Sequence, residues 1–146
     1  MPNRFEWQDR IKAVEREFDA MNFAARRLLN VEWVDLEYVP SSLQQRDLIN
    51  ATERLENTYL IRLFAEFEAG VREYWASIRS TEPKMKPMME SVSGRRGIPT
   101  EVHKGADDVR NERNNCVHRA ERDSQSTLDS HRSALCHYFS FLPTDW

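Results

Sequence analysis

Apolar side chains recur every three or four residues over most of the chain, which is the repeat of an amphipathic helix. The first stripe predicts a helix over residues 4–30, with charged side chains on its other faces. The members of this stripe are Trp7, Ile11, Val14, Phe18, Met21, Ala25 and Leu28. The pattern stops between Val31 and Pro40, which is typical of a connector.

A second stripe continues without a proline and predicts a longer helix over residues 42–80, about 50 Å in length. We expect Ser41 or Ser42 to cap its start, with Gln44 or Gln45 as the reciprocal partner. The stripe consists of Leu48, Thr52, Leu55, Tyr59, Leu63, Phe67, Val71, Tyr74 and Ile78. Two long antiparallel helices of this kind make half of a helical bundle.

Shorter helices are predicted in the rest of the chain. Prolines and glycines leave room for a short helix over Met88–Arg96. A further helix is predicted over residues 99–118, and a last one from Ser124 or Ser126 to just before Pro143. On the helix over 99–118 one face carries Val102, Ala106, Val109, Arg113 and Cys116, so an arginine lies in line with the buried stripe. Residues 1–146 are therefore expected to form a single all-α domain, an up-and-down bundle of four to five helices.

The composition of the chain limits the cellular compartment and the binding partners that we expect for it. The chain of 146 residues has no apolar run near the roughly 20 residues of a bilayer span, and its start lacks the apolar stretch of a secretion signal. We therefore expect a soluble, cytoplasmic protein without membrane contact. Cys116 and Cys136 form no CxxC pair, which favours a reducing compartment and no metal site. The net charge of -3 disfavours a tight nucleic-acid binder but not a protein that touches RNA briefly to cut it.

One short motif in the helix over 99–118 can carry chemistry. Arg113 and Asn114 are followed by three residues and then by His118. An Arg-Asn pair at this spacing from a histidine is expected only about 0.03 times by chance in a chain of this composition. The motif is therefore more specific than the Arg-to-His spacing alone, which Arg132 and His137 also satisfy.

The R-N-x-x-x-H motif resembles that of the HEPN superfamily of small helical-bundle proteins, many of them metal-independent ribonucleases. The segments Leu63–Glu68, Tyr74-Trp75 and Arg95–Pro99 also resemble a bacterial subset of that superfamily, and the likeness covers roughly residues 45–140. The resemblance implies an endoribonuclease that needs no cofactor and leaves 2′,3′-cyclic phosphate and 5′-hydroxyl ends. It also implies a homodimer with a composite site, and a toxin or antiviral defence effector with an antitoxin or defence-system partner.

The residue types of the motif fit RNA cleavage. An imidazole holds and releases a proton near neutral pH, so His118 is the candidate acid/base. A guanidinium is a permanent cation with a planar donor fork, so Arg113 is the candidate that stabilises the developing charge on the phosphate. Asn114 is a candidate to orient the histidine or a phosphate. Phosphate-binding candidates are Arg95, Arg96, Arg110 and Arg119, with Arg122 near them in the sequence; the alternative is that these arginines are simply solvated.

Helix geometry limits how the motif acts. Five residues along a helix turn by about 140° and advance about 7.5 Å, so Arg113 and His118 do not share one target on an undisturbed helix. Either the helix ends before His118, or two copies that meet across a two-fold axis bring them together. The alternative function is a non-catalytic dimeric bundle that binds a partner protein or a nucleotide, with Arg113 in an ion pair and His118 at a polar helix end.

DNA binding by this helix is disfavoured, because positive side chains only slightly outnumber negative ones in this region. His103 is expected to be solvated, and His131 and His137 to be surface or partly buried groups.

Overall fold

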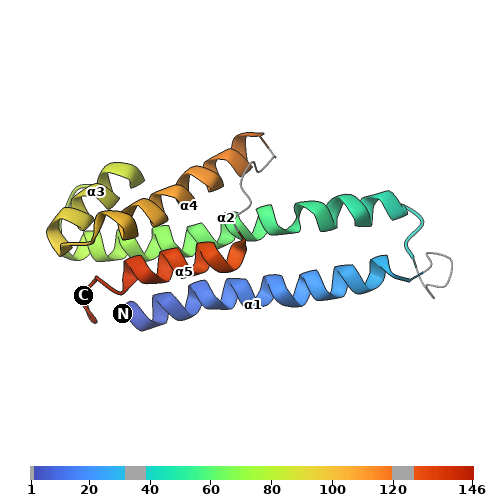
Figure 1. Cartoon of the computed structure of the whole chain (residues 1–146), viewed down its shortest axis with the longest axis horizontal. Helices are drawn as coiled ribbons and strands as arrows, with labels where there is room; N and C mark the ends of the chain where they lie inside the picture. Colours follow the sequence, from blue (N-terminus) through green and yellow to red (C-terminus); the bar gives the residue numbers. More distant parts are fainter. Residues whose placement is uncertain (1, 32–38, 120–126) are drawn as a thin grey trace.

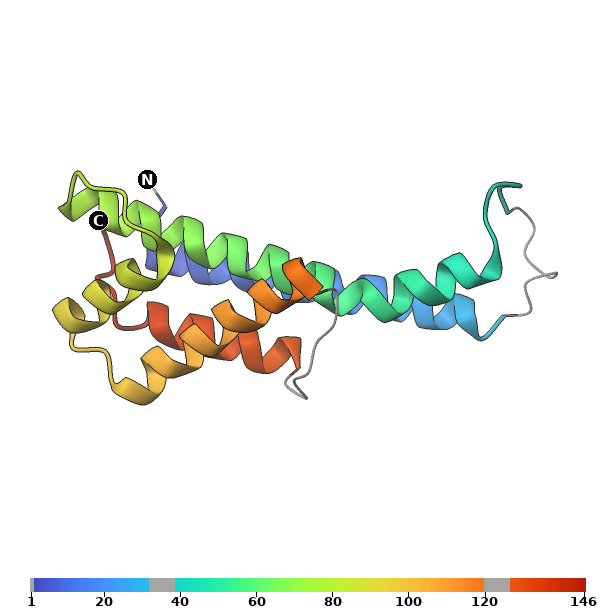
Figure 2. The same ribbon diagram turned by 90° about the horizontal axis from the view of Figure 1, so that it is seen from above.

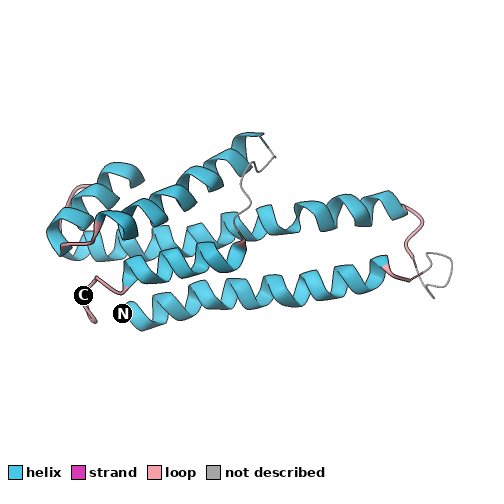
Figure 3. Cartoon of the chain, in the orientation of Figure 1, coloured by secondary structure: helices cyan, strands magenta, loops and turns pink. Residues whose placement is uncertain are grey.

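The computed structural model describes residues 2–31, 39–119 and 127–146, which form five packed helices (Figures 1 and 3). The helices are α1 (Arg4–Leu29), α2 (Gln45–Ile78), α3 (Met85–Arg96), α4 (Thr100–Arg119) and α5 (Leu128–Phe139). The prediction of an all-α helical bundle is confirmed, and the described residues contain no strand. Across these same ranges, none of the helices is both long enough and apolar enough to cross a bilayer.

The two longest helices, α1 and α2, lie side by side as an antiparallel hairpin (Figures 1 and 2). The three shorter helices pack against one half of this hairpin, with α5 against α1 and α4 against both α5 and α2. The other half of the hairpin extends beyond α4 and α5, and the backbone N–H of Leu128 at the start of α5 donates over 3.0 Å to Glu56 of α2. We call this half the arm.

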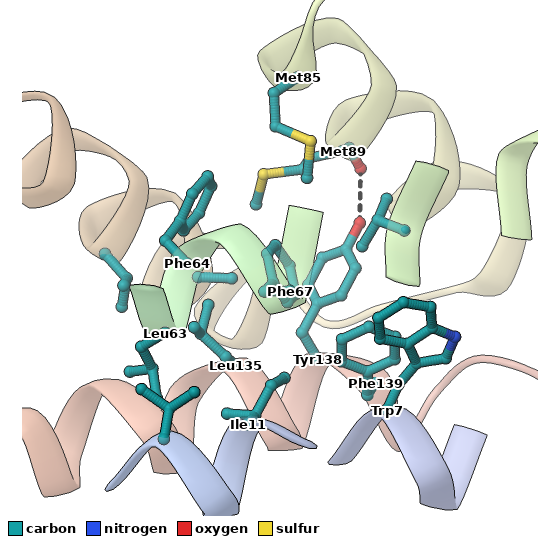
Figure 4. Close-up of a cluster of buried hydrophobic side chains, with 14 of the residues drawn as sticks. Trp7, Ile11, Leu63, Phe64, Phe67, Met85, Met89, Leu135, Tyr138 and Phe139 are labelled. Carbon is teal, nitrogen blue, oxygen red and sulfur yellow. Dashed lines mark hydrogen bonds between the residues drawn. The ribbon is translucent and has the colours of Figure 1, made fainter. Parts of the chain in front are cut away.

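The core lies where the shorter helices meet the hairpin (Figure 4). The Phe67 ring of α2 packs edge-on against two rings of α5, with its centre 5.4 Å from that of Tyr138 and 5.3 Å from that of Phe139. The side chains buried to more than 98% include Ile11, Leu60, Leu63, Phe64, Phe67, Met88, Met89, Leu128, Leu135, Tyr138, Phe139 and Leu142. These large side chains come from every helix except α4, which adds the smaller Ala106, Val109 and Cys116 to the core.

Six of the nine stripe positions predicted for α2 are buried, and the remaining three, Leu48, Leu55 and Ile78, are half-buried. The α1 stripe is different. Trp7, Ile11 and Val14 are buried, but Met21 and Leu28 are 49% and 42% exposed. Only the part of the α1 stripe nearest the N-terminus is therefore buried. The periodicity continues along α1, but the shorter helices that would cover its outer half end before they reach it.

The start of α2 also differs from the prediction. The helix begins at Gln45 rather than 42, and Gln44 is the N-cap residue. The side chain of Asp47 accepts a hydrogen bond of 2.8 Å from the Gln44 backbone N–H. Asp47 is the third helical residue after this cap, the place that Gln44 or Gln45 would take after Ser41 or Ser42. A carboxylate is a stronger acceptor than an amide and also favours the positive end of the helix dipole, so the cap forms at Gln44. For α5 the N-cap is Thr127, while Ser124 and Ser126 lie outside the described residues.

Candidate functional site

Arg113 lies on the side of α4 that faces α2. Its guanidinium carbon is 4.9 Å from the centre of the Phe64 ring, and Nη2 donates a 3.3 Å hydrogen bond to Glu68 Oε2. The side chain keeps 26% of its surface exposed. Ala106, Val109 and Cys116 on the same face are buried, as the periodicity predicts. The helix therefore lays the stem of this arginine on the core and leaves part of its charged end accessible.

Glu68 connects two arginines at this place. Its Oε1 atom accepts from Arg72, with distances of 2.9 Å to Nε and 2.8 Å to Nη2, while Oε2 accepts from Arg113. Arg72 is held further by a 3.2 Å hydrogen bond from Nη1 to the Pro83 carbonyl. The three side chains together carry one net positive charge. Sequence reasoning gave no role to Glu68 or Arg72, although their spacing of four residues on a helix is a signal for an ion pair.

A small hollow of about 220 Å³ opens beside the Arg113 side chain. Ile61, Ala65, Glu68 and Arg113 line it. Ile61 and Ala65 are exposed, so the hollow is a surface groove between α2 and α4 with apolar walls and a charged end. An anionic group at this end would meet a guanidinium whose position two neighbouring side chains already fix.

His118 is exposed and lies near the end of α4, whose last residue is Arg119. The helix is unbroken from Arg113 to His118, so the two side chains leave it in directions about 140° apart. Asn114, which lies between Arg113 and His118 in the sequence, is half-buried. A single chain therefore does not bring the imidazole of His118 and the guanidinium of Arg113 onto one face, in agreement with the geometric expectation.

The predicted phosphate-binding arginines are spread over the surface. Arg110 is 14% exposed and is occupied by Asp107 (2.7 Å) and by the Asn111 side chain (2.9 Å). Arg95 and Arg96 are exposed at the end of α3, near the start of α4, whereas Arg113 lies about 20 Å along α4 from its first residue. Of the predicted set only Arg119 is close to His118 in the chain. Arg122 lies outside the described residues.

Glu112 and His131 fix the rotation of α4 at the motif. His131 Nε2 of α5 is 2.6 Å from Glu112 Oε2, and both residues are buried, with 5% and 9% exposure. Because Glu112 faces α5, the next residue, Arg113, is turned by about 100° towards α2. The sequence offered no sign of this pair beyond the two residue types.

A second polar chain connects α4, α3 and α5. The Ser93 hydroxyl lies 2.6 Å from His103 Nδ1 and donates over 3.2 Å to the Tyr138 hydroxyl, which in turn donates over 2.9 Å to the Met89 carbonyl. Burial raises the pKa of Tyr138 above its ordinary value, because the charged form loses its hydration. The expectation that His103 is solvated is wrong: the residue is half-buried, because α3 folds back against α4.

The described residues contain no group of three or more His, Cys, Asp and Glu side chains placed to hold a metal ion. Cys116 is buried and Cys136 is half-buried. No protein-family model, curated protein or solved structure matches the chain.

Proposed function

We propose that the chain is a metal-independent endoribonuclease of the HEPN type that acts as a homodimer. The proposal rests on the Arg113, Asn114 and His118 motif and on one structural observation. Arg113 is partly exposed and held in place by Phe64 and Glu68, at the end of a surface groove. A positioned guanidinium at an open groove is what stabilisation of a reacting phosphate requires.

Arg113 is the group that would receive the phosphate. The planar fork of donors stabilises the negative charge that develops on the phosphate oxygens in the transition state. The Phe64 ring and the Glu68 carboxylate reduce the freedom of the side chain before substrate arrives. Arg72 offsets the charge of Glu68, so the cluster stays attractive to an anion.

His118 is the proton carrier of the proposal. In the reaction a ribose 2′-oxygen attacks the adjacent phosphorus, the P–O2′ bond forms and the P–O5′ bond breaks. A proton leaves the 2′-hydroxyl and another reaches the departing 5′-oxygen, which imidazoles at the two sides of the phosphate can accept and donate. The products are a 2′,3′-cyclic phosphate and a 5′-hydroxyl, with no water or metal consumed.

The two groups need a second chain to act together. A two-fold axis beside the C-terminal end of α4 would place His118 of one chain opposite Arg113 of the other. Val117, which is 51% exposed, offers an apolar contact at this axis. Arg119 follows His118 directly in the sequence and is the arginine of the predicted set that we propose to guide the flanking phosphates. A role as a toxin or defence effector, with an antitoxin or defence partner, belongs to the same proposal.

The test is RNA cleavage by the purified protein in the presence of a chelator. Wild-type protein should cut cellular RNA and leave cyclic phosphate ends, whereas His118→Ala and Arg113→Ala should each lose at least about 100-fold in rate. His137→Ala and Arg16→Ala serve as matched controls, because both residues are exposed and lie outside the motif. Equal rates in all variants, or no cleavage by the wild-type protein, would overturn the proposal.

The second candidate is a non-catalytic dimeric module that binds a partner protein or a nucleotide. The ion pair between Arg113 and Glu68 favours it, since a purely structural arginine would make the same contact. In that case Arg113→Ala would lower the melting temperature while RNA stays intact with every variant, and a bound nucleotide would raise the melting temperature of the wild-type protein.

A further inference from the structure

One side of the arm is marked by an ion pair between its two helices. Arg62 of α2 and Glu17 of α1 lie 2.7 Å apart, and about half of each side chain is exposed. Steps of four, three and four residues along a helix stay on one face. Counted from this ion pair towards the outer end of the hairpin, such steps reach Met21, Ala24 and Leu28 on α1, and Thr58, Leu55 and Ala51 on α2.

These six side chains form a continuous surface, which we call the arm face. Met21 and Leu28 are 49% and 42% exposed, Ala24, Ala51 and Thr58 are exposed, and Leu55 is half-buried. None of the six side chains is charged, and the exposed Arg54, one turn of α2 before Thr58, lies beside them. Small residues alternate with large ones along it, so a matching surface can approach closely.

No described helix covers the arm face. α5 lies on the other side of α1, where Arg132 donates over 3.0 Å to Glu15 and the Cys136 carbonyl accepts over 2.9 Å from Gln8. Glu17 comes two residues after Glu15 and is turned by about 200° from it, so its side faces away from α5. The view from above shows the shorter helices on one side of the hairpin only (Figure 2).

The charges beside the arm face identify a self-complementary arrangement. Glu17 lies at its inner end and Arg27 lies beside Leu28 at its outer end. If two arm faces meet with their helices antiparallel, about a two-fold axis between Met21 and Ala24, each Arg27 comes within about 1.5 Å, one residue along the helix, of the level of Glu17 of the other copy. Met21 then packs against Ala24 of the other copy, and the ion pair forms twice by symmetry.

We propose that the arm face binds the arm face of a second copy of this chain, as an antiparallel four-helix bundle. The face spans about 17 Å along the helices and two helix widths across. The area that two such faces bury is small for a specific interface, so the dimer should be weak and its population should depend on protein concentration. The antiparallel arrangement also keeps the α3–α5 halves of the two copies at opposite ends.

This interface does not include Arg113 or His118, although Ala65 in the hollow beside Arg113 lies on the same face of α2 as Thr58. Arg113 contacts Phe64 and Glu68, which lie on other faces of α2 than Arg62 and Thr58. Pairing through the arm therefore adds to pairing through α4, and each can fail without the other. If both exist and their two-fold axes cross at right angles, the particle contains four chains; if only the arm pairs it contains two.

The test compares two substitutions on the same helix, with molar mass measured by light scattering or sedimentation across a range of concentrations. Met21→Glu puts a charge into the arm face and should halve the mass of the particle. Phe23→Glu is the matched control, because Phe23 is 67% exposed but lies about 200° round the helix from Met21, and it should leave the mass unchanged. Circular dichroism verifies that both variants stay helical.

A second pair of substitutions tests the antiparallel arrangement. In Arg27→Glu, each contact between residue 27 of one copy and Glu17 of the other brings two negative charges together. Association should therefore weaken by roughly tenfold. Arg26→Glu changes the same charge on the opposite side of α1 and should leave association unchanged. The proposal is overturned if the wild-type protein is a monomer at all concentrations, if Met21→Glu and Phe23→Glu have the same mass, or if Arg26→Glu weakens association as much as Arg27→Glu. RNA cleavage is scored separately and does not enter this result.

Discussion

The guanidinium carbon of Arg113 lies 4.9 Å from the centre of the Phe64 ring, so the guanidinium charge of the motif rests on a side chain that is itself fully buried. The position of this charge therefore depends on the packing of the core.

Phe64→Leu should slow RNA cleavage by roughly tenfold and lower the free energy of unfolding by about 1–2 kcal/mol, because the ring that supports Arg113 is lost. Cleavage kinetics and urea unfolding measure the two effects. Phe67→Leu is the matched control: Phe67 is equally buried on the same helix but packs against Tyr138 and Phe139. It should cost similar stability and leave the rate of the folded protein unchanged. Equal slowing in both variants would mean that Phe64 acts through stability alone.

Gly70→Ala should destabilise the protein by about 1–3 kcal/mol. A Cβ atom at this position would lie 2.5 Å from Phe139 Cζ and 2.9 Å from Trp7 Cδ2, so both rings would have to move. Gly94→Ala provides the opposite case, because no atom lies within 4 Å of a Cβ there and the residue is inside α3. It should stabilise by about 0.5–1 kcal/mol through helix propensity. Thermal unfolding of both variants measures the difference, and a stabilising Gly70→Ala would show that the rings are not packed as described.

Tyr138→Phe should lower the free energy of unfolding at neutral pH by about 1–2 kcal/mol, because the Met89 carbonyl loses its donor. Burial raises the folded-state pKa of Tyr138 above its ordinary value of 10. The folded protein therefore favours the neutral phenol, and the stability that this gives is fully present below pH 10 and declines as pH rises above it. Urea unfolding at about pH 8 and about pH 11 should show the advantage of wild type over Tyr138→Phe shrinking at the higher pH. A constant difference would contradict the burial of the hydroxyl.

His131→Phe should destabilise the protein by about 1–3 kcal/mol, because the buried Glu112 carboxylate loses its imidazole contact at 2.6 Å. His137→Phe, an exposed position on the same helix, should change stability by less than about 0.5 kcal/mol. Chemical denaturation of both variants gives the comparison. Since Glu112 precedes Arg113, His131→Phe should also slow RNA cleavage, and unchanged cleavage would show that the pair does not orient the motif.

The helices and the arginine in line with the α4 stripe were predictable from the sequence, because a buried face has the same period as the helix that carries it. Thr52, Tyr59, Leu63 and Phe67 show this on α2, where every predicted position is buried or half-buried. Periodicity says which residues share a face but not what covers that face. Met21 and Leu28 belong to a regular stripe and are still exposed, because burial depends on where α4 and α5 end.

The polar pairs were not predictable for a related reason. Ser93 and His103 come from different helices, and Glu68 and Arg113 are separated by 45 residues. No local pattern sets the distance between such side chains; the packing of α3 and α2 against α4 sets it. For the same reason the sequence identifies the motif but not the two side chains, Phe64 and Glu68, that hold its arginine.

The contact of α1 with α5 has a consequence during synthesis of the chain. Gln8 and Cys136 are hydrogen-bonded partners but are translated 128 residues apart. Until the ribosome has released the segment Leu128–Leu142, the α1–α2 hairpin carries Trp7, Ile11 and Phe67 on a surface open to water. The nascent chain should therefore bind chaperones up to that point and release them when its last helix emerges.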